Sequence, residues 1–267
     1  MTAGTRYPYR RTRGATATPA GPMSLYEAID QHSPLLWYKT DETSGTLASS
    51  GSVSTALDNF QGTAPTYSQD GPETGVTKGI DWSAANNWAR NTTTGMPTTA
   101  AGTIIVFAKQ ATGSFNSTAW FSQANTSNFV QVLFFGVNPE SVGSTHRLGI
   151  AAFTTSASNR RVAYGSTDTS TLINTGWHMF AVTQDGTTGF KLYIDGVAET
   201  VTDATNGTPP AITAWTSTLN NANSRIVMGQ SIYGSASSNS SATVSNICLF
   251  DFALSAAQLL EIAGFMT

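Results

Sequence analysis

Short apolar segments separated by polar turn residues make up most of the chain from residue 35 onward. Each segment is rich in Val, Ile, Phe, Tyr or Trp and is bounded by Gly, Asn, Asp, Ser or Pro, the pattern of β-strands joined by turns. Since no helical pattern lies between them, the order favours an antiparallel sandwich over βαβ units. The predicted strands are residues 35–39, 103–109, 119–123, 129–137, 147–153, 161–164, 177–184, 190–194, 225–229 and 243–250.

Two Asp-Gly pairs separate consecutive segments in the second half of the chain. Asp185-Gly186 lies between residues 177–184 and 190–194, and Asp195-Gly196 follows directly after the latter. Asp-Gly between alternating strands is a strong hairpin signal, because glycine accepts a positive φ. The sequence therefore predicts two consecutive hairpins, which form a meander.

Two short helices flank the strand-rich region. Ser24 is a good N-cap and has Glu27 three residues later, the spacing of a capping box, so a helix is predicted to end near His32. At the other end, Ser255 can cap a helix with Leu259, Ile262 and Ala263 on one face, closed by Gly264.

The composition narrows the class of protein. Only 11% of the 267 residues are charged, against about 25% in an average protein, while 40% are hydrophobic. Disorder throughout is excluded by this apolar content, and no apolar run reaches the roughly 18 residues of a transmembrane helix. We also expect no secretory signal, because no apolar stretch follows the basic residues at the N-terminus. The single cysteine, Cys248, excludes an intrachain disulfide and is expected to be buried and inert.

Charge is distributed unevenly along the chain. The first 22 residues hold four arginines and no acid, whereas the rest holds nine basic and sixteen acidic residues. A basic segment with several prolines and no apolar periodicity cannot form a core of its own, so we predict an extended arm at 1–22, a short helix and linker at 23–34 and a sandwich domain at 35–267. A disordered tail is the alternative. The candidate tether residues of the arm are Arg6, Tyr7, Tyr9, Arg10, Arg11 and Arg13.

An ordered set of motifs resembles a known family. The set consists of WYKTDETSGT at 37–46, GWHMFAVT at 176–183, LYIDG at 192–196, IVMG at 226–229 and VSNICLFDFALS at 244–255. Together these are similar to the laminin-G-like branch of the concanavalin A-like lectin/glucanase superfamily, over roughly residues 35–264. The resemblance implies an all-β jelly-roll sandwich of two antiparallel sheets with a terminal helix, and a tight turn at Asp195-Gly196. It also implies a core that contains Trp177, Phe180, Val182, Leu192, Ile194, Ile247, Leu249 and Phe250.

The acidic residues do not predict an enzyme. Glycosidases need two carboxylates about 5–10 Å apart, and no predicted strand presents alternating acids. The side chains of Asp41 and Glu42 would point to opposite faces of an extended strand. The histidines are far apart in sequence, and His178 is predicted to be a packed or edge residue.

Calcium is the one cofactor that the sequence leaves open. Relatives in the lectin and laminin-G families often hold this ion at a loop end, and Asp58 with Asn59 is the candidate pair here. Asp81 with Asn86-Asn87 and Asp203 with Asn206 are further candidates. Ordinary turn chemistry is the alternative for all three, because none is a dense acidic loop.

Exposed aromatic and amide side chains would suit a glycan. Trp stacks on the C–H faces of sugars and Asn bonds their hydroxyls, so a glycan site is a hypothesis for loops that hold both. The alternative is that Trp88 belongs to a strand and Trp82 packs beneath its loop. The candidate residues are Trp82, Asn86, Asn87, Trp88, Trp215 and Tyr233.

The combined features resemble laminin-G-like proteins of bacteriophage virions, attached to the tail or the capsid. That resemblance implies a structural component of a virus particle, made in the host cytoplasm and displayed on the virion surface. Its arm would bind other virion proteins, its copies would form a homo-oligomer within the assembly, and its sandwich would contact host glycans. Membrane and nucleic-acid partners are not expected. The alternative is a free-standing carbohydrate-binding lectin or an inactive glucanase relative.

Overall fold

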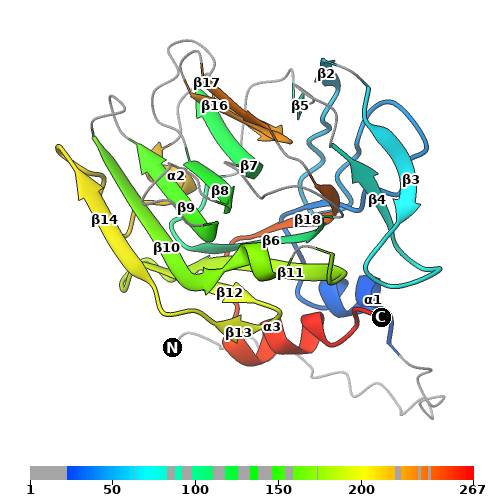
Figure 1. Ribbon diagram of the computed structural model, residues 1–267. Helices are drawn as coiled ribbons and strands as arrows, with labels where there is room; N and C mark the ends of the chain where they lie inside the picture. The colour runs from blue at the N-terminus through cyan, green and yellow to red at the C-terminus, as the bar shows by residue number, and fades with distance from the viewer. Residues whose placement is uncertain are drawn as a thin grey trace, which may run out of the picture.

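The computed structural model (Figure 1) describes residues 23–62, 64–82, 88–91, 98–110, 118–125, 133–137, 146–153, 159–172, 174–219, 224–233, 236–239 and 242–267. Two antiparallel sheets of eight strands each form a sandwich, as the sequence predicts. The arm at 1–22, with all its candidate tether residues, lies outside the described residues.

The first sheet has the order β13-β12-β11-β6-β18-β4-β3, with β1 also paired to β18. The predicted meander is confirmed, because β11, β12 and β13 are neighbours and Ile194 pairs with Val197 across the Asp195-Gly196 turn. Both turn residues have positive φ, 51° and 79°. The strands are β1 (Leu36–Tyr38), β3 (Thr66–Asp70), β4 (Lys78–Asp81), β6 (Gly102–Lys109), β11 (Trp177–Gln184), β12 (Phe190–Ile194), β13 (Val197–Ala198) and β18 (Thr243–Phe250).

The second sheet has the order β14-β10-β9-β8-β7-β15-β5-β2, and a separate hairpin, β16-β17, packs near β7. Its strands are β2 (Asn59–Gln61), β5 (Trp88–Arg90), β7 (Thr118–Asn125), β8 (Leu133–Val137), β9 (Arg147–Phe153), β10 (Arg160–Asp168), β14 (Thr202–Asn206) and β15 (Ser224–Met228). The hairpin is β16 (Gln230–Tyr233) and β17 (Ala236–Asn239), and two short helical turns are η1 (Thr169–Leu172) and α2 (Thr216–Leu219).

Several strands that the apolar pattern does not predict lie at sheet edges or are very short. The sequence of β14 is TDATN, and four of its five residues are exposed. Edge strands need few apolar side chains because they bury little, so hydropathy alone does not reveal them. The other unpredicted strands are β2, β3, β4, β5, β16 and β17.

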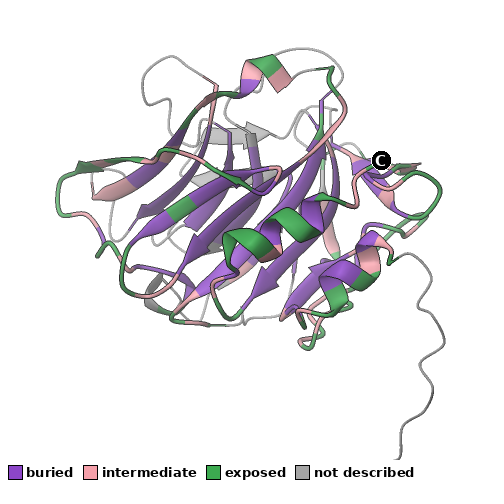
Figure 2. Ribbon diagram, turned by 90° about the horizontal axis from the view of Figure 1, so that it is seen from below, coloured by how far each residue is buried: buried purple, intermediate pink, exposed green. Residues whose placement is uncertain are grey.

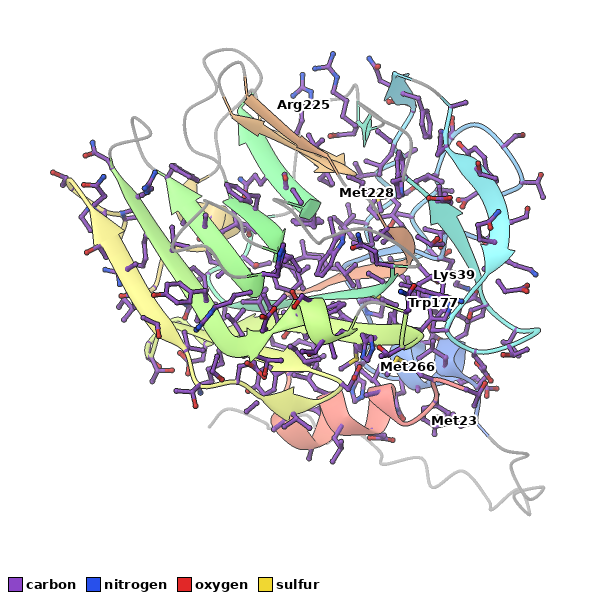
Figure 3. All side chains as sticks on the ribbon, in the orientation of Figure 1. Met23, Lys39, Trp177, Arg225, Met228 and Met266 are labelled. Atoms are coloured by element: carbon purple, nitrogen blue, oxygen red, sulfur yellow. The ribbon has the colours of Figure 1, made fainter. Side chains whose placement is uncertain are left out.

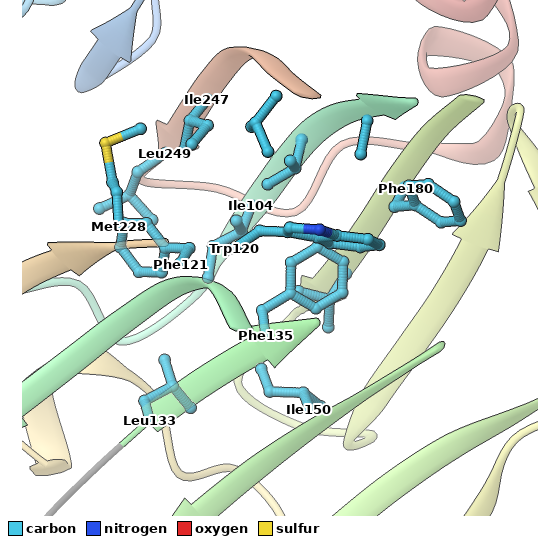
Figure 4. Close-up of a cluster of buried hydrophobic side chains, with 14 of the residues drawn as sticks. Ile104, Trp120, Phe121, Leu133, Phe135, Ile150, Phe180, Met228, Ile247 and Leu249 are labelled. Carbon is cyan, nitrogen blue, oxygen red and sulfur yellow. The ribbon is translucent and has the colours of Figure 1, made fainter. Parts of the chain in front are cut away.

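The main core lies between the sheets, where side chains that alternate along each strand meet (Figure 4). Trp120 from β7 packs against Phe180 from β11, with ring centroids 4.5 Å apart, and against Phe135 from β8 at 6.0 Å. Ile104 belongs to this cluster, whereas its neighbour Ile105 belongs to a second one on the other face of β6. The period of two thus divides the apolar residues of β6 between two cores.

The second core lies on the outer face of the first sheet, which two helices cover (Figure 2). These are α1 (Leu25–Asp30) and α3 (Ala256–Ala263). The predicted capping box of Ser24 with Glu27 and the predicted N-cap Ser255 are both confirmed, and Ser255 also forms a capping box with Gln258. The segment at 23–34 therefore packs on the sandwich. No helix in the described part of the chain is long and apolar enough to cross a membrane.

Cys248 belongs to this second core and is fully buried as a free thiol, as predicted. Burial raises the pKa of its thiol well above the ordinary value. The thiol therefore stays protonated and unreactive at neutral pH.

Candidate functional site

Two of the aromatic residues predicted to bind a glycan are buried instead. Trp82 is 1% exposed and stacks on Phe60, with ring centroids 6.4 Å apart and planes 5° apart. Trp215 is 0% exposed and lies 6.2 Å from the Phe190 ring. The prediction that these two rings offer a sugar platform is wrong, because the apolar indoles are drawn into the core between the sheets.

The other predicted glycan residues remain untested as contacts. Trp88 begins β5 and pairs with Gln61, and Tyr233 ends β16 opposite Ala236. Asn86 and Asn87 lie outside the described residues.

For calcium, Asp58 is exposed just before β2 and Asn59 is the first residue of that strand. Within the described ranges, no three side chains among His, Cys, Asp and Glu come together as a metal site would need. The calcium candidates therefore remain a prediction from the sequence.

A groove of about 450 Å³ lies at one end of the first sheet, on the face that α1 and α3 cover. Trp177, the first residue of β11, lines it together with Met266, and both are labelled in Figure 3. The family resemblance implied that Trp177 is a core residue, but its side chain is only partly buried at the border of the second core. The reason is positional, because β11 starts there and the helices do not extend over its first residue.

Two other strands and the chain end form the rest of the groove. Lys109 ends β6 directly opposite Trp177, and Asp70 ends β3. The turn after β3 holds the chain end in place: the Thr267 N–H donates to the Pro72 carbonyl at 2.9 Å, and the Thr74 hydroxyl donates to the Thr267 carbonyl at 3.1 Å. The full lining is Asp70, Gly71, Pro72, Thr74, Lys109, Thr175, Gly176, Trp177, Met266 and Thr267.

The Trp177 ring packs closely against Gly79 of β4. A Cβ atom on Gly79 would lie 3.1 Å from the ring carbon Cη2 of Trp177, so only glycine leaves the ring its present room. A ring that is packed on one side and borders a groove on the other can present a flat apolar surface at small entropic cost.

The polar groups around this ring are varied. Lys109 is exposed and its ammonium carries hydrogen-bond donors only. Asp70 forms an ion pair with Lys78, whose Nζ lies 3.1 Å from Asp70 Oδ1. Three threonines, Thr74, Thr175 and Thr267, add hydroxyl groups. An apolar face surrounded by donors and acceptors is the arrangement that suits a polyhydroxylated ligand, and about 450 Å³ falls in the range of small-molecule sites.

A chain of three side chains runs behind one wall of the groove. The Thr175 hydroxyl lies 2.7 Å from His178 Nε2, and His178 Nδ1 lies 2.7 Å from Asp195 Oδ2. The second oxygen of Asp195, Oδ1, accepts the Met179 N–H at 2.8 Å. His178 is thus a packed residue, as the sequence predicts, and it connects the Asp195 turn to the groove.

A smaller hollow of about 260 Å³ lies beside α1. Its two aromatic residues, Tyr26 and Trp37, are covered by the Lys39 ammonium, which lies 4.9 Å and 4.3 Å from their ring centroids. A cation of the chain itself occupies the aromatic faces there, so the Trp177 groove is the better candidate for a ligand.

Sequence reasoning missed this groove because its residues come from four separated segments that meet only in the fold. The signal available in the sequence was Trp177 at the start of a strand, beside Thr175 and Gly176. A tryptophan at a strand end can be exposed on a face where its strand neighbours are covered.

Comparison with known proteins identifies the fold. No protein-family model matches the sequence, and no curated protein matches it. Among solved structures, domain 4 of AbnA, an extracellular GH43 arabinanase from Geobacillus stearothermophilus, in complex with arabinotriose, is similar at a TM-score of 0.55 and 16% identity, over 86% of this chain and 98% of that domain.

Two further matches have lower TM-scores. The CBM40 of the Ruminococcus gnavus IT-sialidase, bound to α2,3-sialyllactose, has a TM-score of 0.46 and 14% identity, over 73% of this chain and 97% of that one. The ligand-binding domain of botulinum neurotoxin serotype D, in complex with N-acetylneuraminic acid, has a TM-score of 0.49 and 12% identity, over 89% of this chain and 52% of that one. The likeness to domain 4 of AbnA shows that the chain shares the fold of that domain.

Proposed function

We propose that this chain is a carbohydrate-binding module that holds a glycan in the Trp177 groove. The observation that carries the proposal is the half-buried Trp177 ring in a groove of about 450 Å³, with Lys109 and threonine hydroxyls around it. Sugars stack their C–H faces on tryptophan and exchange hydrogen bonds with such groups. The lectin-like fold supports the proposal as an analogy of architecture.

The proposed function is binding without catalysis. Asp70 is the one acidic side chain among the described residues that line the groove, and it is ion-paired with Lys78. Glycoside hydrolysis in most families uses two carboxylates that flank the scissile bond. A single paired carboxylate at the rim suits recognition of a sugar better than its cleavage.

A glycan array followed by calorimetry tests the proposal. The array includes arabinotriose and α2,3-sialyllactose as a neutral and an acidic probe, because both are bound by proteins of this fold. Trp177→Ala should raise the dissociation constant for a bound glycan by about fivefold to a hundredfold, since a stacked ring contributes about 1–3 kcal/mol. The matched control is Leu260→Ala, which truncates an exposed apolar side chain on α3, away from the groove, and should leave binding unchanged.

The experiment distinguishes a wrong function from a wrong binding site. If the wild-type protein binds no glycan on the array, the function is wrong. If it binds and Trp177→Ala binds equally well, the function stands and the site lies elsewhere.

We propose secondly that the module belongs to a virus particle, in which the arm at 1–22 binds other virion proteins and the sandwich is displayed on the surface to contact host glycans. The supporting observation is the charge contrast, with four arginines and no acid in the arm against nine basic and sixteen acidic residues in the rest. Such an arm suits acidic partners, which include other copies of the chain.

Deletion of residues 1–22 separates the virion protein from a free-standing lectin. Under the virion proposal the shortened chain no longer enters particles and loses self-association in light scattering, while glycan binding persists. Incorporation at full occupancy without the arm would rule out the tether.

A further inference from the structure

Thr175 lines the groove, and the proton of its hydroxyl is already used inside the protein. Its Oγ1 lies 2.6 Å from the Leu172 carbonyl oxygen and 2.7 Å from His178 Nε2. The carbonyl can only accept a hydrogen bond, and the imidazole nitrogen can accept one when it carries no proton. The single hydroxyl proton therefore points either to Leu172 or to His178.

The orientation of His178 is fixed by Asp195. Both carboxylate oxygens of Asp195 are acceptors, Oδ1 for the Met179 N–H at 2.8 Å and Oδ2 for His178 Nδ1 at 2.7 Å. Nδ1 is therefore the protonated nitrogen, and Nε2 faces Thr175. Asp195 itself is held in the tight turn with φ of 51°, so the whole chain of contacts is anchored in the β11-β12-β13 meander.

The consequence is the same in either protonation state of His178. If Nε2 is protonated, it donates to Thr175 and the hydroxyl donates to Leu172. If it is not, the hydroxyl donates to one of the two. In both cases the Thr175 oxygen has a lone pair left for the groove and no proton to offer.

Lys109 is the opposite of Thr175, because its ammonium only donates hydrogen bonds. It pairs with Trp177 across β6 and β11, so both side chains lie on the same face at the same end of the sheet. Both residues line the groove, and within the described part of the chain the Lys109 ammonium makes no hydrogen bond or ion pair. An ammonium donates and cannot accept. The groove that Trp177 lines therefore includes a pure acceptor, Thr175, and a pure donor, Lys109.

Resting on the proposed glycan-binding function, we propose that Thr175, oriented by His178 and Asp195, is the specificity-determining contact that selects a sugar with a hydrogen-bond donor at this position. The donor is a sugar hydroxyl or the N–H of an acetamido group, while a ring or hydroxyl oxygen of the same sugar accepts from Lys109. A carboxylate or an ether oxygen at the Thr175 position is rejected, because two acceptors would face each other. His178 and Asp195 are positioning residues, which act on the ligand only through Thr175.

A double-mutant cycle tests this assignment, with arabinotriose, α2,3-sialyllactose and the array glycan of highest wild-type signal as probes. Thr175→Val keeps the shape and removes the hydroxyl, and should weaken binding about fivefold to tenfold, the loss of one hydrogen bond. Thr175→Ser restores the hydroxyl and should bind within about twofold of wild type. His178→Gln should weaken binding in the wild-type background and have no further effect in the Thr175→Val background.

These readouts separate positioning from a merely structural role, which would give additive losses and no rescue by serine. Additive losses, or wild-type binding by Thr175→Val while Trp177→Ala loses binding, would overturn the assignment and leave the glycan function intact. Absence of wild-type binding to every probe would overturn both. Thermal unfolding of each variant verifies that the fold is retained.

Discussion

The indole of Trp37 donates a hydrogen bond to the side chain of Asn246, from Nε1 to Oδ1 at 2.9 Å, and both residues are buried. Asn246 lies at the irregularity in the pairing of β18 with β6, between Ser245 and Cys248, and has φ of 44°. Its Nδ2 donates to the Ser245 hydroxyl at 2.9 Å, which in turn donates to the Lys78 carbonyl. One amide thus connects β1, β18 and β4 where the sheet bends.

Replacing Asn246 should destabilise the protein in two separable steps. Asn246→Gly accepts the positive φ but leaves the Trp37 N–H buried without its partner, which costs about 1–3 kcal/mol. Asn246→Ala adds the strain of a Cβ in the left-handed region, about 1–2 kcal/mol more. Urea unfolding of both variants measures the difference, and equal stability of the two would contradict the role given to φ.

The contact between Trp120 and Phe180 should dominate the stability of the main core. Both side chains are 0% exposed and their centroids are 4.5 Å apart. Phe180→Ala should lower the free energy of unfolding by about 3–5 kcal/mol, because the dense core cannot close the cavity. Leu260→Ala, which truncates an apolar side chain that is 56% exposed, is the control and should change it by no more than about 0.5 kcal/mol.

Glu42 should make stability fall as the pH rises. Burial is the largest cause that raises the pKa of this carboxyl in the folded protein, although the Ala48 N–H donates to its Oε1 at 2.7 Å. A folded-state pKa above the unfolded one contributes stability that is fully present below the unfolded pKa and is lost as the pH rises through the folded pKa.

Glu42→Gln keeps an acceptor for Ala48 and removes the charge. It should therefore raise the free energy of unfolding at pH 7, by less than about 1 kcal/mol because the side chain is partly exposed, and the gain should vanish below about pH 4. Urea unfolding from pH 3 to 8 measures this dependence. A gain that is the same at every pH would show that charge is not the cause.

The Asp185 carboxyl should have the opposite effect on stability, which should fall as the pH falls. The Thr188 hydroxyl is the largest cause that lowers the pKa of this carboxyl, followed by the N–H groups of Thr188 and Thr187, each of which donates to Asp185. A depressed folded-state pKa contributes stability that is present above the unfolded pKa and is lost as the pH falls through the folded pKa.

Asp185→Ala should consequently lower the melting temperature at pH 7, and the gap to wild type should narrow as the pH falls below about 4. Asp251→Ala, which removes another exposed carboxylate, is the control. A gap for Asp185→Ala that does not change with pH would contradict the hydrogen-bonded turn as its source.

Local features of the fold follow directly from the sequence. The Asp195-Gly196 turn and the capping box of Ser255 with Gln258 depend on neighbours within a few residues, so their chemistry is readable along the chain. The long strands β6, β11 and β18 are equally readable, because both of their faces are buried and their apolar content is high.

The sequence does not show which aromatic residues are accessible. Trp82 and Trp215 stand in polar stretches and predict exposed platforms, yet both are buried, whereas Trp177 stands in an apolar motif and borders a groove. A tryptophan carries the same apolar surface in every case, and its exposure depends on whether another segment covers it.

By itself, then, the sequence determined an all-β sandwich with two capped helices, because turns, caps and alternation are properties of neighbouring residues. Only the tertiary structure decided where a ligand can bind. Lys109, Thr175, Trp177 and the chain end at Thr267 meet because strand pairing joins β6 to β11 and hydrogen bonds hold the end against the β3–β4 turn. Such long-range contacts arise from the packing of whole elements, and no local pattern encodes them.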